Sequence, residues 1–183
     1  MAAVIETLIE CSCKTVGEGP HWDGQSQTLL YVDIIDGSLH RWSSVTGQDE
    51  KHTFGKYDIV KYIGNARVAI DFDDEERQLT GFPDGMTIDV DGNIWVACFN
   101  GGTLVKFNPN TGSQISSIEV PVYRPTSCCF GGPYYDQLFI TCSRYELSEE
   151  ELKQTPLAGS VFRICNLGTR GTPAPIYEGT IEK

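Results

Sequence analysis

Basic residues are scarce in this chain, since 14 lysines and arginines stand against 25 aspartates and glutamates, a formal net charge of -11. Proteins that bind nucleic acid or anionic membranes need basic patches, so the sequence predicts neither partner. No stretch approaches the ~18 apolar residues of a membrane-spanning helix. The N-terminus, MAAVIETLIECSC, has no basic region, which argues against a secretory signal peptide. We therefore expect a cytoplasmic protein that handles a small molecule or a cation.

Paired cysteine motifs are also missing. The seven cysteines contain no CxxC pair, and an odd number with the vicinal pair Cys128-Cys129 does not suit a disulfide framework. Cys98, Cys128, Cys129 and Cys142 lie in apolar strand-like runs, where a thiol behaves as a small hydrophobe. We interpret the cysteines as reduced core thiols rather than as a zinc or redox site.

Helical periodicity is almost absent, and short alternating strands separated by turn residues dominate. One segment, Leu147–Gln154, has the composition of a helix, with Ser148 as its N-cap. The expected strands are Thr28–Ile34, Ser38–Trp42, Met86–Asp89, Ile94–Cys98, Thr103–Phe107, Ser113–Glu119, Ser127–Phe130, Gln137–Cys142 and Ser160–Ile164.

The hairpins resemble one another. LLYVDIIDGSLHRWSSVTG (29–47) aligns with IWVACFNGGTLVKFNPNTG (94–112), and residues 138–164 form a third copy with an insertion. Repeated small antiparallel units of this kind are typical of β-propeller blades. The second and third copies lie 44 residues apart (Trp95 to Phe139), which fits one blade of ~40–45 residues. The first and second copies lie about one and a half blades apart, so something between them is incomplete.

Three contiguous motifs carry a family resemblance. GEGPHWD with LLYVD (17–33), FPDGMTIDVDGNIWVACFNGG (82–102) and TSCCFGGPYYDQLFITCS (126–143) resemble the regucalcin/SMP-30, gluconolactonase and luciferin-regenerating enzyme family. The resemblance covers residues 3–56 and 57–177. It implies a six-bladed β-propeller that binds one divalent cation in its central channel and hydrolyses a sugar lactone.

The two resembling stretches do not adjoin in the family pattern. Residues 1–56 match the first blade and residues 57–183 match the late blades, so the resemblance implies an internal deletion with its join near Lys56-Tyr57. Six blades of ~45 residues need about 270 residues, against 183 here. We expect a single all-β region, 1–183, that forms an incomplete propeller of about three to four blades with four-stranded antiparallel sheets.

Glu18 and Asp84 are the candidate site residues. Local sequence alone favours a turn for Glu18, which lies between two glycines, and for Asp84 in PDGM. The resemblance instead identifies Glu18 as a ligand of the cation, and Asp84 as both a ligand and the catalytic base. The cation could be Ca²⁺, Zn²⁺, Mn²⁺ or Mg²⁺, all of which accept carboxylate oxygen.

The rest of the family site has no counterpart in this sequence. Two asparagines that complete the metal shell, and an arginine and an asparagine that bind the sugar, belong to the central blades, so no substrate-binding residue is identified. We expect a gluconolactonase-like enzyme whose activity is weak or lost. The alternatives are a non-catalytic, calcium-binding or regulatory truncated isoform, and a fragment that does not fold. The sequence does not determine the oligomeric state.

Two further acidic stretches receive structural interpretations. Asp89-Val90-Asp91-Gly92-Asn93 lacks the spacing of a calcium-binding loop, and we predict a hairpin turn. The run from Asp71 to Glu76 is interpreted as a solvated acidic face.

Overall fold

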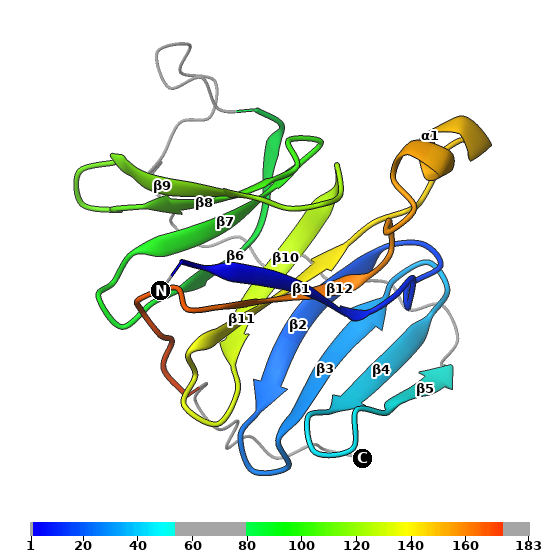
Figure 1. The fold of residues 1–183 in the computed structure, drawn as a ribbon, viewed down its shortest axis with the longest axis horizontal. Helices are drawn as coiled ribbons and strands as arrows, with labels where there is room; N and C mark the ends of the chain where they lie inside the picture. Colours follow the sequence, from blue (N-terminus) through cyan, green and yellow to red (C-terminus); the bar gives the residue numbers. More distant parts are fainter. Residues whose placement is uncertain (1, 54–79, 174–183) are drawn as a thin grey trace, which may run out of the picture.

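Three four-stranded antiparallel sheets make up the computed structural model, which describes residues 2–53 and 80–173 (Figure 1). The first blade contains β2 (Gly17–Asp23), β3 (Thr28–Asp33), β4 (Ser38–Ser43) and β5 (Asp49–Thr53). The second blade contains β6 (Phe82–Ile88), β7 (Ile94–Phe99), β8 (Thr103–Phe107) and β9 (Gln114–Glu119). The third blade contains β10 (Pro125–Gly131), β11 (Gln137–Cys142) and β12 (Val161–Cys165), with β1 (Val4–Ile9) as its outer strand.

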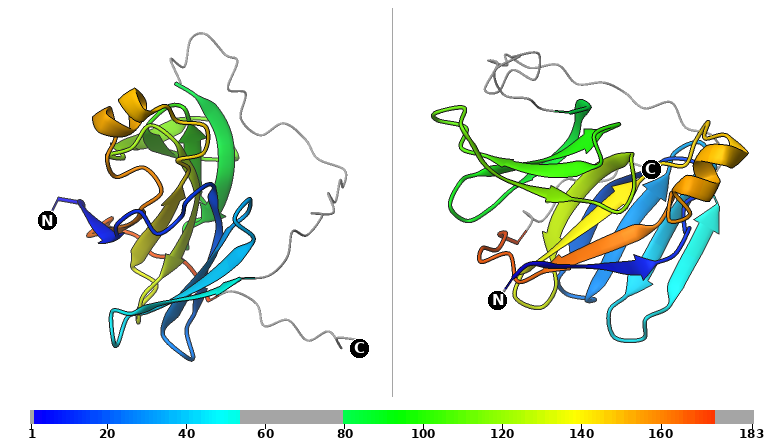
Figure 2. Two further views of the ribbon diagram at one scale, coloured as in Figure 1. Left: turned by 90° about the vertical axis from the view of Figure 1, so that its right-hand side faces the viewer. Right: turned by 45° about the horizontal axis from the view of Figure 1, so that its top comes forward.

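The third blade lies between the other two. Its inner strand β10 contacts β2 of the first blade on one side and β6 and β7 of the second blade on the other. Figure 2 shows the resulting fan of sheets, in the order second, third, first. The all-β class and the incomplete propeller expected from the sequence are therefore confirmed, and the described blades number three.

Aromatic side chains fill the seams between the blades. In the seam between the second and third blades, Trp95 meets Phe130 edge to face, with ring centroids 6.1 Å apart. In the seam between the third and first blades, Phe139 stacks on Trp22 with centroids 5.4 Å apart. Burying rings of this size supplies much of the hydrophobic stabilisation that holds such sheets together.

The expected strands are confirmed to within a few residues at each end. The helix is also confirmed as α1 (Glu149–Gln154), because the Ser148 side chain accepts a hydrogen bond from the Glu151 N–H as an N-cap does. β1, β2 and β5 were not expected from the sequence. The strand-like pieces Lys56–Tyr62 and Ala66–Phe72, and the join at Lys56-Tyr57, lie outside the described residues.

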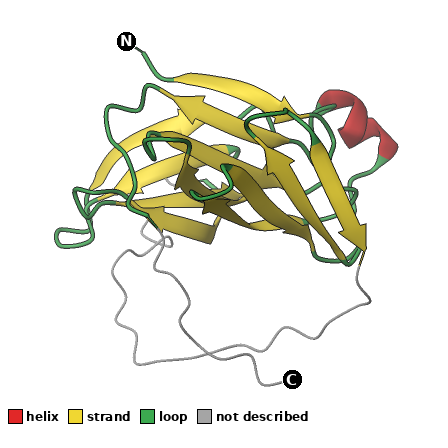
Figure 3. Cartoon of the chain, turned by 90° about the horizontal axis from the view of Figure 1, so that it is seen from below, coloured by secondary structure: helices red, strands yellow, loops and turns green. Residues whose placement is uncertain are grey.

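Helix α1 lies at one edge of a body made of strands (Figure 3). Within residues 2–53 and 80–173, no helix is long and apolar enough to cross a membrane. All seven cysteines are free, as expected, and burial raises the pKa of the Cys13 and Cys142 thiols to about 12. Such thiols remain protonated and act as packing groups.

The buried carboxylate of Asp33 holds the segment that joins β1 to β2. It accepts the backbone N–H groups of Lys14, Thr15 and Val16 at 2.7, 3.0 and 3.0 Å, and the Thr15 hydroxyl also donates to it. These hydrogen bonds fix the backbone immediately before Gly17, where β2 begins.

Replacing Asp33 with alanine should therefore lower the free energy of unfolding by about 3 kcal/mol, since several donors would lose a charged acceptor. Urea unfolding followed by circular dichroism measures this change. Glu50→Ala, at an exposed position of β5, is the control and should change stability by less than about 0.5 kcal/mol. Equal losses in the two variants would show that Asp33 does not hold this segment.

Candidate metal centre

Glu18 lies near the start of β2, at an irregularity in the strand. The register between β2 and β3 shifts between Glu18 and His21, and Gly19 adopts a positive φ of 54° there. This backbone conformation suits glycine, which has no Cβ. Glu18 itself is half-buried and accepts the N–H of Gly19 at 2.9 Å. The GEGP stretch is thus neither a plain turn nor a regular strand, but a bulged inner strand that carries a carboxylate.

Asp84 occupies the matching place on β6. The register between β6 and β7 shifts between Pro83 and Met86, which places Asp84 within a second irregularity. Its side chain is half-buried like that of Glu18. Bulges commonly redirect side chains next to functional sites, and here two inner strands each carry one carboxylate at such a point.

Strand β10 separates β2 from β6 and brings both close to itself. A Cβ on Gly85 would overlap the Ser127 Oγ, so only glycine permits this approach of β6 beside Asp84. On the other side of β10, the buried Thr126 hydroxyl donates to the carbonyl of the residue before Glu18. Gly85 and Thr126 thus position the two acidic residues, and both were overlooked in the sequence. The PDGM motif contained the signal for Gly85.

Burial and charge both act on the protonation of these carboxylates. Burial raises the pKa of Glu18, and the negative charge of Asp84 raises it further. The hydrogen bond from the Gly19 N–H lowers this pKa and so offsets part of the rise. Burial also raises the pKa of Asp84, whereas the hydrogen bond from the Gly85 N–H lowers it. The structure thus places the two predicted site residues on the strands that flank β10, at positions where burial disfavours their ionised forms.

This donor set fits a divalent cation in its chemistry but supplies only part of a coordination shell. Two half-buried carboxylates that repel each other would be stabilised by a hard cation between them. Ca²⁺ takes 6–8 oxygen ligands, however, and among the described residues no group of three or more His, Cys, Asp or Glu side chains is placed to hold a metal ion. The remaining ligands would have to be backbone carbonyls or water.

The other acidic candidates lie elsewhere. Asp89 follows β6 in a hairpin turn, as predicted, and it is buried with the Lys106 ammonium at 2.8 Å and the Trp95 indole N–H at 3.1 Å. Asp89 therefore serves the packing of the second blade. The run from Asp71 to Glu76 lies outside the described residues, so its interpretation remains a prediction.

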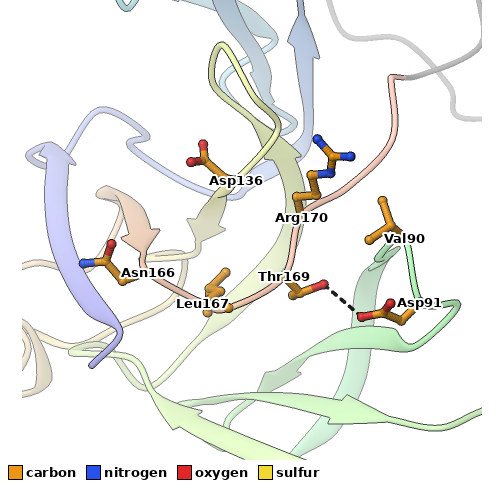
Figure 4. Close-up of a pocket in the computed structure, with 8 residues that line it drawn as sticks. Val90, Asp91, Asp136, Asn166, Leu167, Thr169 and Arg170 are labelled. Atoms are coloured by element: carbon orange, nitrogen blue, oxygen red, sulfur yellow. Dashed lines mark hydrogen bonds between the residues drawn. The ribbon is translucent and has the colours of Figure 1, made fainter. Parts of the chain in front are cut away.

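Two cavities lie apart from the candidate ligands. One, of about 290 Å³, runs along the three inner strands and is lined mainly by apolar and sulfur-bearing side chains, including Met86, Ile88 and Cys129. The other, of about 470 Å³, lies near the turn after β6, with Asp91 and Arg170 among its lining residues (Figure 4). Neither is lined by Glu18 or Asp84, and the second is bordered by surface loops whose Thr169 hydroxyl donates to Asp91.

An arginine and an asparagine do lie side by side in the described chain. Arg124 donates to the Asn100 side chain at 3.0 Å and to the Tyr145 carbonyl at 2.7 Å, and its guanidinium lies over the Phe99 ring. Because these partners already engage Arg124, we assign it a structural role rather than one in sugar binding.

Comparison with known proteins gives consistent results. The model of the "SMP-30/Gluconolactonase/LRE-like region" matches residues 16–59 and 52–144. Regucalcin of Bos taurus is 36% identical over 165 residues, which cover 90% of this chain and 50% of the relative, and human regucalcin is 33% identical over the same shares. The chain thus spans about half the length of the curated relatives it matches.

Solved structures agree on the fold. A calcium-binding regucalcin from Agrobacterium tumefaciens superposes with a TM-score of 0.80 at 16% identity, over 94% of this chain and 96% of that one. A luciferin-regenerating enzyme superposes with a TM-score of 0.76 at 19% identity, over 94% of this chain and 98% of that one. Together with the family model and the regucalcin identities, this places the chain in the SMP-30/gluconolactonase/luciferin-regenerating enzyme family.

Proposed function

We propose that this chain binds one divalent cation between Glu18 and Asp84 and uses that site for weak hydrolysis of a sugar lactone. The observation that carries the proposal is the pair of half-buried carboxylates, held at matching bulges on β2 and β6, whose negative charges repel each other. Unfavourable electrostatics of this kind are typical of functional sites. Membership of a gluconolactonase-containing family supports a lactonase-type function.

Asp84 is the proposed base. Lactone hydrolysis adds water across the ring acyl C–O bond. The attacking water loses a proton as the new C–O bond forms, and the ring oxygen takes up a proton and becomes a hydroxyl as the ring C–O bond breaks. A carboxylate with a raised pKa accepts such a proton more readily than an ordinary aspartate. Glu18 holds the second side of the cation, which when bound would polarise the acyl carbonyl as a Lewis acid.

We expect low activity because the described residues offer no evident group to orient the sugar. The cavity along the inner strands is mainly apolar, so sugar hydroxyls would find few hydrogen-bond partners there. Poor positioning of a bound substrate can cost orders of magnitude in rate. The second candidate function, cation binding without catalysis, is favoured by this same incompleteness.

The cation site can be tested through stability. Both carboxylates have raised pKa values in the folded state, so their contribution to stability is greatest below the reference values of 3.8 for Asp and 4.5 for Glu. It is lost as the pH rises through the folded pKa values. In cation-free protein, Asp84→Asn and Glu18→Gln should melt above the wild type at pH 7, and this difference should vanish below about pH 3.5.

Added cation should reverse the order of melting temperatures at pH 7, so that the wild type melts above the two variants. A cation present at about 100 times its Kd stabilises the native wild type by about 2.7 kcal/mol, whereas the two variants should gain far less. Thermal melts with EDTA and with each of Ca²⁺, Mg²⁺, Mn²⁺ and Zn²⁺ measure this, and Glu50→Gln is the matched control. Equal cation-induced shifts in Glu18→Gln and the wild type would exclude this site.

Catalysis needs a separate assay. Hydrolysis of gluconolactone, followed by acid release, should be cation-dependent and should fall at least about 100-fold in Asp84→Ala, the range expected for loss of a general base. Glu50→Ala should retain wild-type activity. Turnover that survives in Asp84→Ala would contradict the proposed role of Asp84. Cation binding with no turnover for any cation would instead establish the non-catalytic function.

A further inference from the structure

The cavity along the inner strands lies where all three described blades meet. β2 of the first blade, β6 of the second and β10 of the third each line part of it, and β10 contacts both of the other strands. Its volume is about 290 Å³, and neither Glu18 nor Asp84 lines it. The cavity is therefore separate from the candidate metal centre.

This cavity offers no fixed charge to a ligand. Among the described residues that line it, none is Asp, Glu, Lys or Arg, and the one imidazole, that of His21, belongs to an exposed residue. Burial raises the pKa of the Cys128 and Cys129 thiols, so both are uncharged at neutral pH. A charged ligand would lose water without gaining a counter-charge, so the lining favours an uncharged molecule.

Aromatic and sulfur-bearing side chains make up much of the cavity wall. Trp22, Phe130 and Tyr135 contribute rings, and Met86 and Cys129 contribute polarisable sulfur atoms. Rings and sulfur atoms both form favourable contacts with aromatic molecules. An apolar cavity of about 150 Å³ holds one benzene molecule, so this larger cavity has room for two fused rings.

The Trp22 side chain adds one polar requirement. Its indole N–H is buried, and the described residues provide no hydrogen-bond acceptor for it. The ring is held in place, because it stacks on Phe139 with centroids 5.4 Å apart and leaves no room for a Cβ on Gly131. A buried donor without a partner lowers stability, and an acceptor on a bound ligand would remove that cost.

We propose that this cavity binds an uncharged, bicyclic aromatic molecule whose hydrogen-bond acceptor pairs with the Trp22 indole N–H. Its volume lies at the lower end of the range for small-molecule sites, which suits a ligand of this size. The rings pack between the inner strands, and the acceptor fixes their orientation. Binding needs no cation, so the proposal does not depend on the metal site.

Quinoline and naphthalene test this proposal, because they share size and shape but only quinoline carries an acceptor, its ring nitrogen. In NMR titrations with EDTA present, we expect quinoline to bind with a Kd of about 1 mM or lower. Naphthalene should bind about fivefold more weakly, since it leaves the Trp22 N–H without a partner. The EDTA separates this result from any failure of the cation site.

The indole N–H resonances report the predicted hydrogen bond directly. Quinoline should shift the resonance that is missing from the spectrum of Trp22→Phe, and naphthalene should shift it less. The Trp95 indole already donates to Asp89 at 3.1 Å, so its resonance is an internal reference and should move little. Trp22→Phe should bind the two ligands equally, whereas Trp42→Phe, which alters a ring beside Phe139 outside the cavity, should keep the roughly fivefold difference.

A second pair of variants tests the cavity itself. Cys129→Met places a larger side chain in it and should weaken quinoline binding by about tenfold or more. Cys165→Met, at a similarly half-buried position on β12 outside the cavity, should bind as the wild type does. Circular dichroism checks that each variant is folded. Equal affinities of the wild type and folded Cys129→Met, equal affinities of the wild type for the two ligands, or no binding at about 10 mM quinoline would overturn the proposal.

Discussion

The arrangement of the described blades depends on the pairing of β1 with β12. β1 runs antiparallel to β12, with Val4 opposite Cys165, which ties the N-terminus to the outer edge of the third blade. The chain must then cross to the inner side of the first blade, and Asp33 fixes that crossing through three consecutive backbone N–H groups. Glu18 follows directly, so long-range strand pairing determines where this carboxylate lies.

The arrangement of strands also explains why the ionised forms of Glu18 and Asp84 destabilise the native state. β10 and its neighbours exclude water from one side of Glu18 and Asp84 but supply few compensating donors, chiefly one adjacent glycine N–H group for each carboxylate. Asp33 and Asp89, by contrast, are more deeply buried and fully engaged by donors. Carboxylates of one protein thus divide into those that donors stabilise in the native state and a pair whose ionised forms burial disfavours.

The local sequence pattern predicted most strands of the fold but only part of the candidate site. Strands such as Thr103–Phe107 and Gln137–Cys142 are short apolar runs bounded by turn residues, so composition and turn signals sufficed to predict them. β1 and β2 could not be found in this way, because glutamate interrupts β1 and Gly-Pro interrupts β2, and their pairing partners lie far away in sequence or across a bulge. Family resemblance predicted Glu18 and Asp84 as candidate ligands, whereas the close approach of Gly85 to β10 is visible only in three dimensions.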